Sequence, residues 1–311
     1  MNSRPGIVHR KWPAWFALAC LAVCSAFLPA CVFANEAAAC TGGAELSLSA
    51  PESSQGSLLL VEVKNAKPLT EVKGTWNQRN VPFWQETGNS GRERGLLGVD
   101  LEQSPGKYEF TLSGVTASGE TISCTASLEV NKGRFATERL HVGKEFVEPD
   151  PEQIKRANEE RQRLRDIFDH VTPNRLWNGK FRVPLDGVTT GGNFGKRRIL
   201  NGQPGSPHSG VDFPAATGTP VHAAQRGRVV LAEELFFSGN TVVIDHGLGI
   251  YTFYGHLSEI DVKAGDSLES GQVLGKVGAT GRVTGPHLHW GLTVERARVN
   301  PLQLIKLFDN E

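Results

Sequence analysis

Acidic residues are absent from the first 34 positions of this 311-residue chain, although 33 Asp and Glu residues follow. This stretch carries no charge of either sign from position 12 to position 34, and Leu, Ala, Val and Phe dominate it. It closes with Val32-Phe33-Ala34 and opens with three basic residues, Arg4, Arg10 and Lys11. A basic start, an apolar run and small residues at its end are typical of a secretory signal. We therefore expect residues 1–34 to be a signal peptide that is removed.

Two other interpretations of this segment remain open. The apolar run is long enough to span a bilayer, so it could be a retained N-terminal anchor. The residues Leu28-Pro29-Ala30-Cys31 loosely resemble a bacterial lipobox, with proline as an unusual occupant, which would make the chain a lipoprotein at Cys31. A periplasmic or secreted location is the favoured expectation, with no stable membrane insertion after signal cleavage.

Cysteine is scarce, and three of the five cysteines lie inside the apolar run. Cleavage after Ala34 leaves only Cys40 and Cys124. Two cysteines in an exported protein predict one disulfide, here tying the first strand of a strand-rich segment to its last. The alternative is a pair of unpaired buried thiols. Neither cysteine has the close spacing of a metal site.

An excess of positive charge is also lacking, since the 33 Lys and Arg residues equal the 33 Asp and Glu residues. Removal of the three basic residues before position 35 leaves 30 against 33, a net charge of −3. A nucleic-acid partner would favour a basic patch or stripe, so none is expected. No internal repeat or low-complexity tract is present. The length is typical of roughly two domains.

Residues 35–132 have the pattern of short strands separated by Gly, Pro, Asn and Ser, which predicts a small antiparallel sandwich, with an immunoglobulin-like module as our hypothesis. Trp76, Phe83 and Trp84 are candidates for a sugar-binding face, although large aromatics are more often packed in a core. The expected strands are Glu45–Ser49, Leu58–Val63, Glu71–Trp76, Val81–Gln85, Gly95–Leu101, Tyr108–Leu112 and Thr121–Val130.

Residues 133–180 form an expected linker that contains one amphipathic helix over residues 150–171. Asp150 can cap this helix, Pro151 suits its first position, and Pro173 ends it. One face is apolar and the opposite face carries Arg, Lys and Glu. The simpler interpretation is a docking helix between domains. The more specific interpretation is that the helix is a lid over the active site or a surface that binds a regulatory partner.

Residues 181–303 are again rich in β-branched residues, aromatics and glycine, which predicts an all-β domain and a mainly β protein. A helical pattern is absent until Leu302–Phe308, within a tail that we place at residues 304–311. The expected strands are Val221–Ala224, Arg228–Leu231, Thr241–Asp245, Ile250–Tyr254, Gln272–Val277 and Leu288–Val294.

This domain contains five residues of the types that bind zinc. His287 and His289 begin a strand-like run, and side chains two apart leave a strand on the same face. His208 and Asp212 are four apart in a segment whose Gly and Pro argue against a helix, so they too share a side. The fifth is His256. Imidazole and carboxylate are common zinc ligands.

Three protein ligands and one water are typical of a catalytic zinc, so five candidates leave two imidazoles for proton transfer. The chemistry is then hydrolysis of an amide or ester. A structural metal is the main rival, weakened because no cysteine is among the candidates. The lack of an HExxH motif argues against a helical zinc peptidase. Four of the other histidines after position 34 are expected to be packed or solvated, and they are His141, His170, His222 and His246.

Four motifs in this order resemble the M23 family of zinc endopeptidases, the lysostaphin-like or LytM domain. They are His208-Ser-Gly-Val-Asp212-Phe, Gly218-Thr-Pro-Val221, Tyr254-Gly-His256-Leu257 and Thr284-Gly-Pro-His287-Leu-His289. The upstream Gly192-Asn-Phe-Gly195-Lys-Arg197 fits as well, and the resemblance covers residues 181–303.

The resemblance implies roles that spacing alone leaves open. The family's metal ligands correspond to His208, Asp212 and His289, which would bind one Zn²⁺ per chain, and its catalytic histidines correspond to His256 and His287. Some members use a tyrosine six residues before the first ligand, whereas this chain has Gly202 there. The oxyanion role of that tyrosine is therefore unassigned. Arg197 and Arg198 are candidates to meet substrate carboxylates, although surface arginines are more often solvated.

The family cleaves peptide cross-links of bacterial peptidoglycan, and members that have lost ligands act as activators of other hydrolases. Since all five positions are filled here, we expect a zinc-dependent endopeptidase acting on peptidoglycan cross-links or stem peptides. The first alternative is a non-catalytic cell-wall binding protein or an activator of another hydrolase, with the helix at 150–171 as regulator. The second is a zinc peptidase that acts on a protein, such as a Gly-rich target.

Overall fold

The structure is a computed structural model that describes residues 38–85, 91–141, 150–188 and 191–309. It is mainly β and its sheets are largely antiparallel, which confirms the expected fold class. The predicted signal peptide, including Cys31, and the alternative anchor lie outside the described residues. Within the described ranges, neither of the two helices is long and apolar enough to cross a bilayer.

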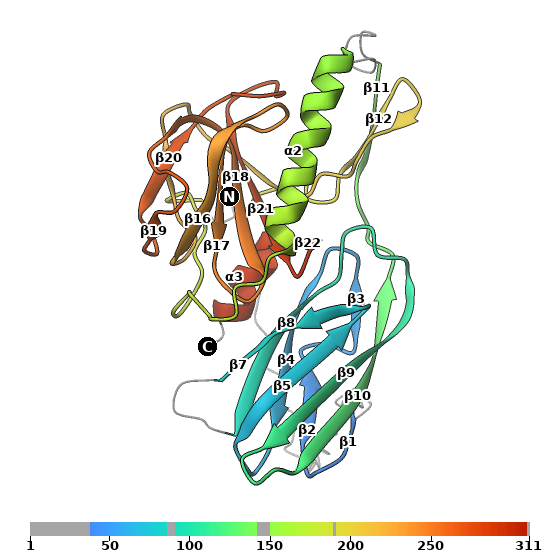
Figure 1. Ribbon diagram of the computed structural model, residues 1–311. Coiled ribbons are helices and arrows are strands. Elements are labelled where there is room, and N and C mark those ends of the chain that lie inside the picture. The colour runs from blue at the N-terminus through green and yellow to red at the C-terminus, as the bar shows by residue number, and fades with distance from the viewer. Residues whose placement is uncertain (1–37, 86–90, 142–149, 189–190, 310–311) are drawn as a thin grey trace, which may run out of the picture. The chain divides into compact units, whose positions relative to one another are not determined.

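The N-terminal half consists of two sheets that pack over a shared core (Figure 1). One sheet has the order β1-β10-β9-β5-β6, with β3 pairing to β10, and the other has the order β2-β4-β8-β7. The strands are β1 (Ala39–Cys40), β2 (Glu45–Leu48), β3 (Glu52–Ser54), β4 (Leu58–Lys64), β5 (Leu69–Trp76), β6 (Arg79–Val81), β7 (Phe83–Gln85), β8 (Arg92–Gly98), β9 (Gly106–Thr116) and β10 (Thr121–Asn131).

Alternation of apolar and polar residues explains this sandwich. Along β10 every second residue from Ile122 to Val130 is buried, and the residues between them are exposed or half-buried. Successive side chains of a strand point to opposite faces, so one face of β10 packs on the core and the other meets water. Trp76 and Trp84 are buried and Phe83 packs against the core, so the core interpretation of these aromatics holds.

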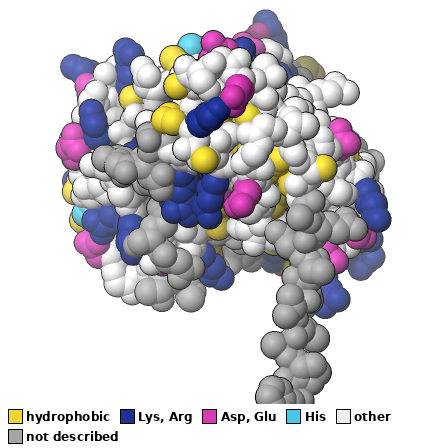
Figure 2. Space-filling model, turned by 90° about the horizontal axis from the view of Figure 1, so that it is seen from below, with side chains coloured by type: hydrophobic (Ala, Val, Ile, Leu, Met, Phe, Trp, Pro, Cys, Tyr) yellow, Lys and Arg dark blue, Asp and Glu magenta, His cyan; other side chains and the backbone are white. Residues whose placement is uncertain are grey.

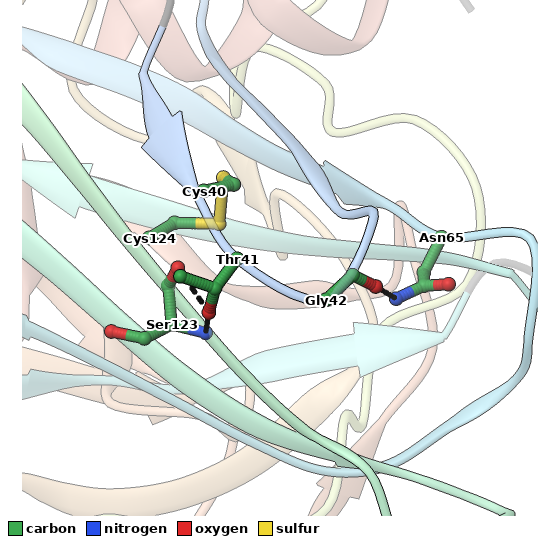
Figure 3. Close-up of a disulfide and its surroundings, with 6 residues drawn as sticks. All are labelled: Cys40, Thr41, Gly42, Asn65, Ser123 and Cys124. Carbon is green, nitrogen blue, oxygen red and sulfur yellow. Dashed lines mark hydrogen bonds between the residues drawn. A yellow bond between two sulfur atoms is a disulfide. The ribbon is translucent and has the colours of Figure 1, made fainter.

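One disulfide joins Cys40 to Cys124, as the cysteine count predicted (Figure 3). The two residues face each other directly in the register of β1 and β10. Next to the bridge, the backbone N–H of Ser123 donates to Oγ1 of Thr41 at 3.0 Å. The short first strand is therefore held to the last strand of the sandwich by a covalent bond and by side-chain hydrogen bonds.

The segment expected to be a linker contains regular structure. β11 (Thr137–Leu140) pairs in parallel with β12 (Arg197–Leu200), which forms a hairpin with β13 (Gln203–Pro204). The helix α2 (Pro151–Asp169) then begins where the capping signals indicated, because the Asp150 carboxylate accepts a hydrogen bond from the N–H of Glu152. The pairing of β11 was not predicted, because its partner lies 60 residues further along the chain.

The C-terminal half is built on a sheet with the order β14-β21-β18-β17-β16-β19, to which β20, β15 and β22 are added (Figure 1). A short helix, α3 (Pro301–Asp309), covers the predicted Leu302–Phe308. The strands are β14 (Gly210–Pro214), β15 (Pro220–His222), β16 (Gly227–Leu235), β17 (Gly239–Asp245), β18 (Ile250–Ile260), β19 (Ser267–Leu268), β20 (Val273–Val277), β21 (His287–Val294) and β22 (Ala297–Val299).

Helix α2 packs on this sheet through its apolar stripe. Leu164, Ile167 and Phe168 lie against a cluster that includes Val243 of β17 and Tyr251 of β18. The rings of Phe168 and Tyr251 are 5.4 Å apart. The packed stripe docks the helix on the C-terminal sheet, and its predicted role between domains stays a prediction.

The sandwich and the C-terminal sheet share contacts within the compact unit Asn35–Glu311. Arg298 of β22 pairs with Asp100 at 2.8 Å, and the Leu58 N–H of β4 donates to Oε1 of Gln303 in α3. Leu58 also belongs to the core cluster of the C-terminal half. Figure 2 shows that basic and acidic side chains are interspersed on the face viewed from below.

Candidate metal centre

Strand pairing brings the two predicted motifs together. β14 is antiparallel to β21, and Asp212 lies directly opposite His289 in their register. Cross-strand partners project on the same face of a sheet, so the carboxylate and the imidazole meet there. Gly210 makes the approach possible, because a Cβ at this position would lie 2.6 Å from the His289 ring.

His208 precedes β14 and is held by a loop at residues 191–196. The N–H of Gly195 donates to the His208 carbonyl at 2.8 Å, and the N–H of His208 donates to the Lys196 carbonyl at 2.9 Å. Gly192 and Asp212 also exchange backbone hydrogen bonds in both directions. These bonds fix the backbone on both sides of the His208 and Asp212 pair.

Three ligand-type atoms converge at this point. Nε2 of His208 lies 3.0 Å from Oδ1 of Asp212 and 2.9 Å from Nδ1 of His289. Nδ1 of His289 lies 3.1 Å from the same Asp212 oxygen. Tetrahedral zinc with bonds of about 2.0–2.2 Å separates its ligand atoms by roughly 3.3–3.6 Å. The three side chains therefore fit a zinc ion after an expansion of a few tenths of an ångström.

One hydrogen bond determines which ring nitrogen of His208 carries the lone pair. Its Nδ1–H donates to the backbone carbonyl of Asn193 at 3.0 Å. The lone pair of the neutral imidazole is then on Nε2, the atom that faces Asp212 and His289. A ring N–H that donates to a carbonyl on the far side is the usual support of a metal-binding histidine. Within the described ranges, His208, Asp212 and His289 are the one group of three or more such residues close enough to hold a metal ion.

The electrostatics favour an ionised Asp212 carboxylate beside a neutral His289 imidazole. Burial raises the pKa of Asp212, but the contacts with His208 and His289 outweigh burial and hold this pKa far below its usual range. Burial lowers the pKa of His289, and the contact with Asp212 offsets only part of that effect. A deprotonated carboxylate and neutral imidazoles are the protonation states that bind a metal.

His256 adjoins the trio from β18, on the other side of β21. Gly255 faces His289 in the register, and a β-bulge in β18 sets Gly255 and His256 opposite one residue of β17. His256 has φ +65°, in the left-handed region that non-glycine residues rarely adopt. A bulge re-aims a side chain, and here it turns His256 out of the regular alternation.

The ring of His256 is oriented by Thr280. Its Nδ1–H donates to the Thr280 carbonyl at 2.9 Å, which leaves the lone pair on Nε2. His256 is 8% exposed as a residue, and burial lowers its pKa to about 4. The imidazole is therefore neutral near pH 7 and able to accept a proton.

His287 completes the group at the start of β21. Its Nδ1–H donates to the Gly285 carbonyl at 2.9 Å, and its Nε2 lies 3.7 Å from Oδ1 of Asp212. The rings of His256 and His287 are 4.8 Å apart between centroids. All five predicted residues therefore lie together, three with converging ligand atoms and two beside them.

The site lies on the same face of the sheet as helix α2. Tyr251, Phe253 and Gly255 alternate along β18 and so share one face, and His289 is paired with Gly255. The Phe253 ring lies 5.8 Å from the His289 ring and also packs against the cluster under α2. One aromatic side chain thus separates the histidine cluster from the core beneath the helix.

The four other histidines in the described part of the chain are not part of this cluster. His246 is fully buried, with its ring nitrogens 2.8 Å from the Arg226 carbonyl and 2.7 Å from Oγ1 of Thr252. His222 is held by the Gly271 carbonyl, and His141 and His170 are exposed. These four are packed or solvated, as predicted.

The tyrosine position and the two arginines gain no role from the structure. Gly202 lies in the turn between β12 and β13 with φ +85° and open space around it. Arg198 lies 3.5 Å from the carboxylate of Glu138 in β11, and Arg197 is exposed. Sequence reasoning missed Asn193, which contacts two of the converging residues. Its only signal was a position inside the Gly192–Arg197 motif.

Comparisons with known proteins agree with this geometry. The model of peptidase family M23 matches residues 206–301. The chain is 32% identical over 212 residues to the peptidoglycan DD-endopeptidase ShyA of Vibrio cholerae, an alignment that covers 67% of this chain and 44% of ShyA. It is 42% identical over 122 residues to ShyC of the same organism, which covers 39% of this chain and 28% of ShyC.

A solved protein from Pseudomonas aeruginosa, described as an M23 peptidase, superposes with a TM-score of 0.58 at 29% identity. That superposition covers 83% of this chain and 96% of the solved one. The chain spans less than half the length of the curated relatives above. The matched region contains all five clustered residues, and the chain belongs to peptidase family M23 through this domain.

Proposed function

We propose that this chain is a zinc-dependent endopeptidase that hydrolyses peptide bonds in the cross-links or stem peptides of peptidoglycan. The observation that carries the proposal is the convergence of His208 Nε2, Asp212 Oδ1 and His289 Nδ1 within 3.1 Å, with two further imidazoles adjacent. The names of the curated relatives indicate the substrate.

In this proposal His208, Asp212 and His289 hold one Zn²⁺. A zinc ion held by three protein ligands polarises a carbonyl and activates water at neutral pH. Asp212 contributes the negative charge of the ligand set, and the histidines contribute ring nitrogens. The hydrogen bond from His208 to the Asn193 carbonyl keeps the ligating nitrogen directed at the site.

His256 and His287 move protons in the same proposal. Both donate Nδ1–H to a backbone carbonyl, so both present Nε2 as the basic atom. The low pKa of His256 makes it a neutral base at pH 7 that accepts a proton from water and returns one to the leaving amine. His287, whose Nε2 lies 3.7 Å from Oδ1 of Asp212, shares the proton transfers with His256 and the stabilisation of the oxyanion.

The test is digestion of purified peptidoglycan by the chain lacking residues 1–34, with and without a chelator. We expect new peptide ends with the wild-type protein, loss of hydrolysis with the chelator, and recovery when Zn²⁺ is added. H208A should release none. If the wild-type protein releases no peptide ends, or H208A equals it, the enzyme proposal is wrong. Binding to peptidoglycan without hydrolysis would instead support the binding-module alternative.

The bond cut is proposed from the relatives named DD-endopeptidases, whose name specifies a bond between two D-configured residues. Mass spectrometry of products from defined cross-linked peptides identifies the bond. We expect cleavage of D-Ala-linked peptides and none of pentaglycine. Preferential cleavage of pentaglycine or of a Gly-rich protein would shift the proposal to the protein-directed alternative.

We also propose that the chain acts in the cell envelope after removal of residues 1–34. The support is the basic and apolar N-terminal pattern together with the Cys40–Cys124 disulfide, a bond that persists in oxidising compartments. Cell fractionation and N-terminal sequencing test this, with Asn35 expected as the first residue. A protein found in the cytoplasm with its first 34 residues intact contradicts it.

A further inference from the structure

Asn193 has an unusual conformation in the loop that supports the metal centre. Its φ is +72°, in the left-handed region, and the loop is fixed by the backbone hydrogen bonds between Gly192 and Asp212 and between Gly195 and His208. Asn is among the few non-glycine residues that adopt this conformation readily. Its side chain and its carbonyl are thereby both directed towards β14.

Two different atoms of Asn193 contact two different ligand residues. Its carbonyl accepts a hydrogen bond from Nδ1–H of His208 at 3.0 Å. Its side-chain Nδ2 donates to Oδ2 of Asp212 at 3.2 Å. In each case the atom contacted is the one that faces away from the converging group, so Nε2 of His208 and Oδ1 of Asp212 remain directed at the metal position.

We infer that Asn193 is a positioning residue that orients His208 and Asp212 for zinc. The inference rests on the proposed zinc function and adds to it a specific outer-shell residue. Asn combines the two features that the position requires of a residue type, which are tolerance of a positive φ and a side-chain N–H donor, and its carbonyl accepts from both His208 and the Lys196 N–H. Gly would lack the donor, Ala would strain the backbone, and Asp would place a second negative charge beside Asp212.

Zinc affinity of the full chain, measured against a chromophoric chelator, tests this without any substrate. The N193G variant keeps the backbone conformation and the carbonyl but removes the donor to Asp212. Loss of an outer-shell partner lowers metal affinity about 10- to 100-fold. We expect N193G near the lower end of that range. N193A should lie near the upper end, because its strained backbone also moves the carbonyl away from His208.

Asn201 provides a matched control. It also has a positive φ, +51°, and lies in the turn between β12 and β13. N201G makes the same chemical change outside the ligand contacts, so its zinc affinity should equal that of the wild type. The visible spectrum of the Co²⁺-substituted protein gives a second readout, because altered ligand geometry changes the bands in N193G and leaves them unchanged in N201G.

Thermal unfolding of the zinc-free proteins separates folding from metal binding, and N193G should unfold close to the wild-type temperature. If N193G binds zinc as tightly as the wild type, or if N201G loses as much zinc affinity as N193G, the inference about Asn193 is wrong and the proposed function is unaffected. Failure of the wild-type chain to bind zinc overturns it together with the proposed function. A zinc-binding wild type that hydrolyses no peptidoglycan would contradict only the proposed function, and the affinity difference would still stand.

Discussion

The strands β10 and β21 both contain alternating polar and apolar residues, but their polar faces have different surroundings. Along β10 the polar residues face water and the apolar residues form the core of the sandwich. Along β21, His287 and His289 alternate with buried Leu288 and Trp290, but the residues after them are buried on both faces. The two histidines of β21 thus face other side chains, whereas the polar residues of β10 face water.

The difference arises from what lies next to each strand. β21 is flanked by β14 on one side and β18 on the other, so residues on its polar face meet Asp212 and Gly255 across the sheet. Polar residues on the outer face of β10, such as Ser127, are exposed and have no comparable set of partners in register. Alternation identifies a face, and the neighbouring strands decide whether that face is a surface or a site.

The largest effect is expected when a histidine is removed from the polar face of β21. H289A should lower peptidoglycan hydrolysis by at least about 10³-fold, because loss of a metal ligand exceeds the 10- to 100-fold effect of an outer-shell change. Zinc content and product release measure the effect. S127A, the corresponding change on the polar face of β10, should leave both unchanged. More than a tenth of wild-type activity in H289A would contradict the ligand assignment.

The next largest effect separates the two roles within the cluster. H256A should lower kcat by about 10²–10⁴-fold while zinc remains bound, because a general base acts on the reaction and not on the metal. Steady-state kinetics and zinc analysis check this. H222A removes a half-buried histidine of the same domain and should retain activity. Loss of zinc in H256A would instead place His256 among the ligands.

The third experiment removes the disulfide of the sandwich and leaves the residues of the candidate site unchanged. The C40S/C124S variant should lose about 2–4 kcal/mol of unfolding free energy, because the bridge closes a long loop and restricts the unfolded chain. Urea denaturation measures this, and reduced wild-type protein should behave in the same way. Hydrolysis by the folded protein at 25 °C should be unchanged. A parallel loss of zinc would show that the two β regions are coupled.

The smallest effect concerns His246 and pH. Burial lowers the pKa of His246 from an ordinary 6.5 to about 4, so between these values the unfolded chain binds more protons than the folded one. The stabilisation is complete above pH 6.5 and is lost as the pH falls towards 4, by up to about 3 kcal/mol. Urea denaturation at pH 7 and at pH 4.5 measures it. H246Q should be less stable at pH 7, and an undiminished pH dependence in it would exclude His246 as the source.

Local pattern was sufficient for most elements of the fold. Short runs of strand-forming residues between turn residues predicted β10 and β21 within one residue at each end, and capping residues predicted the start of α2. These signals are local, because a strand needs one apolar face and a helix needs partners for its first N–H groups. The parallel pairing of β11 with β12 has no local signal and was missed.

The candidate site, too, was predicted only in part from the sequence. Spacing placed His287 with His289 on one face, and the family resemblance supplied the expected division between metal ligands and catalytic histidines. The bulge that turns His256 towards the cluster and the two contacts of Asn193 were not predictable from spacing. A bulge depends on register with the neighbouring strand, and Asn193 acts through a turn whose geometry its own residue type only permits.

The amino-acid sequence by itself determined a β-rich chain, one cysteine pair and five ligand-type residues, because composition and periodicity are local properties. The tertiary structure alone decided that Asp212 and His289, 77 residues apart, share a register, and that His208 meets His289 across 81 residues. Such contacts form only when β14 and β21 lie side by side. The physical reason is that converging lone pairs require a folded sheet to hold them together against electrostatic repulsion and desolvation.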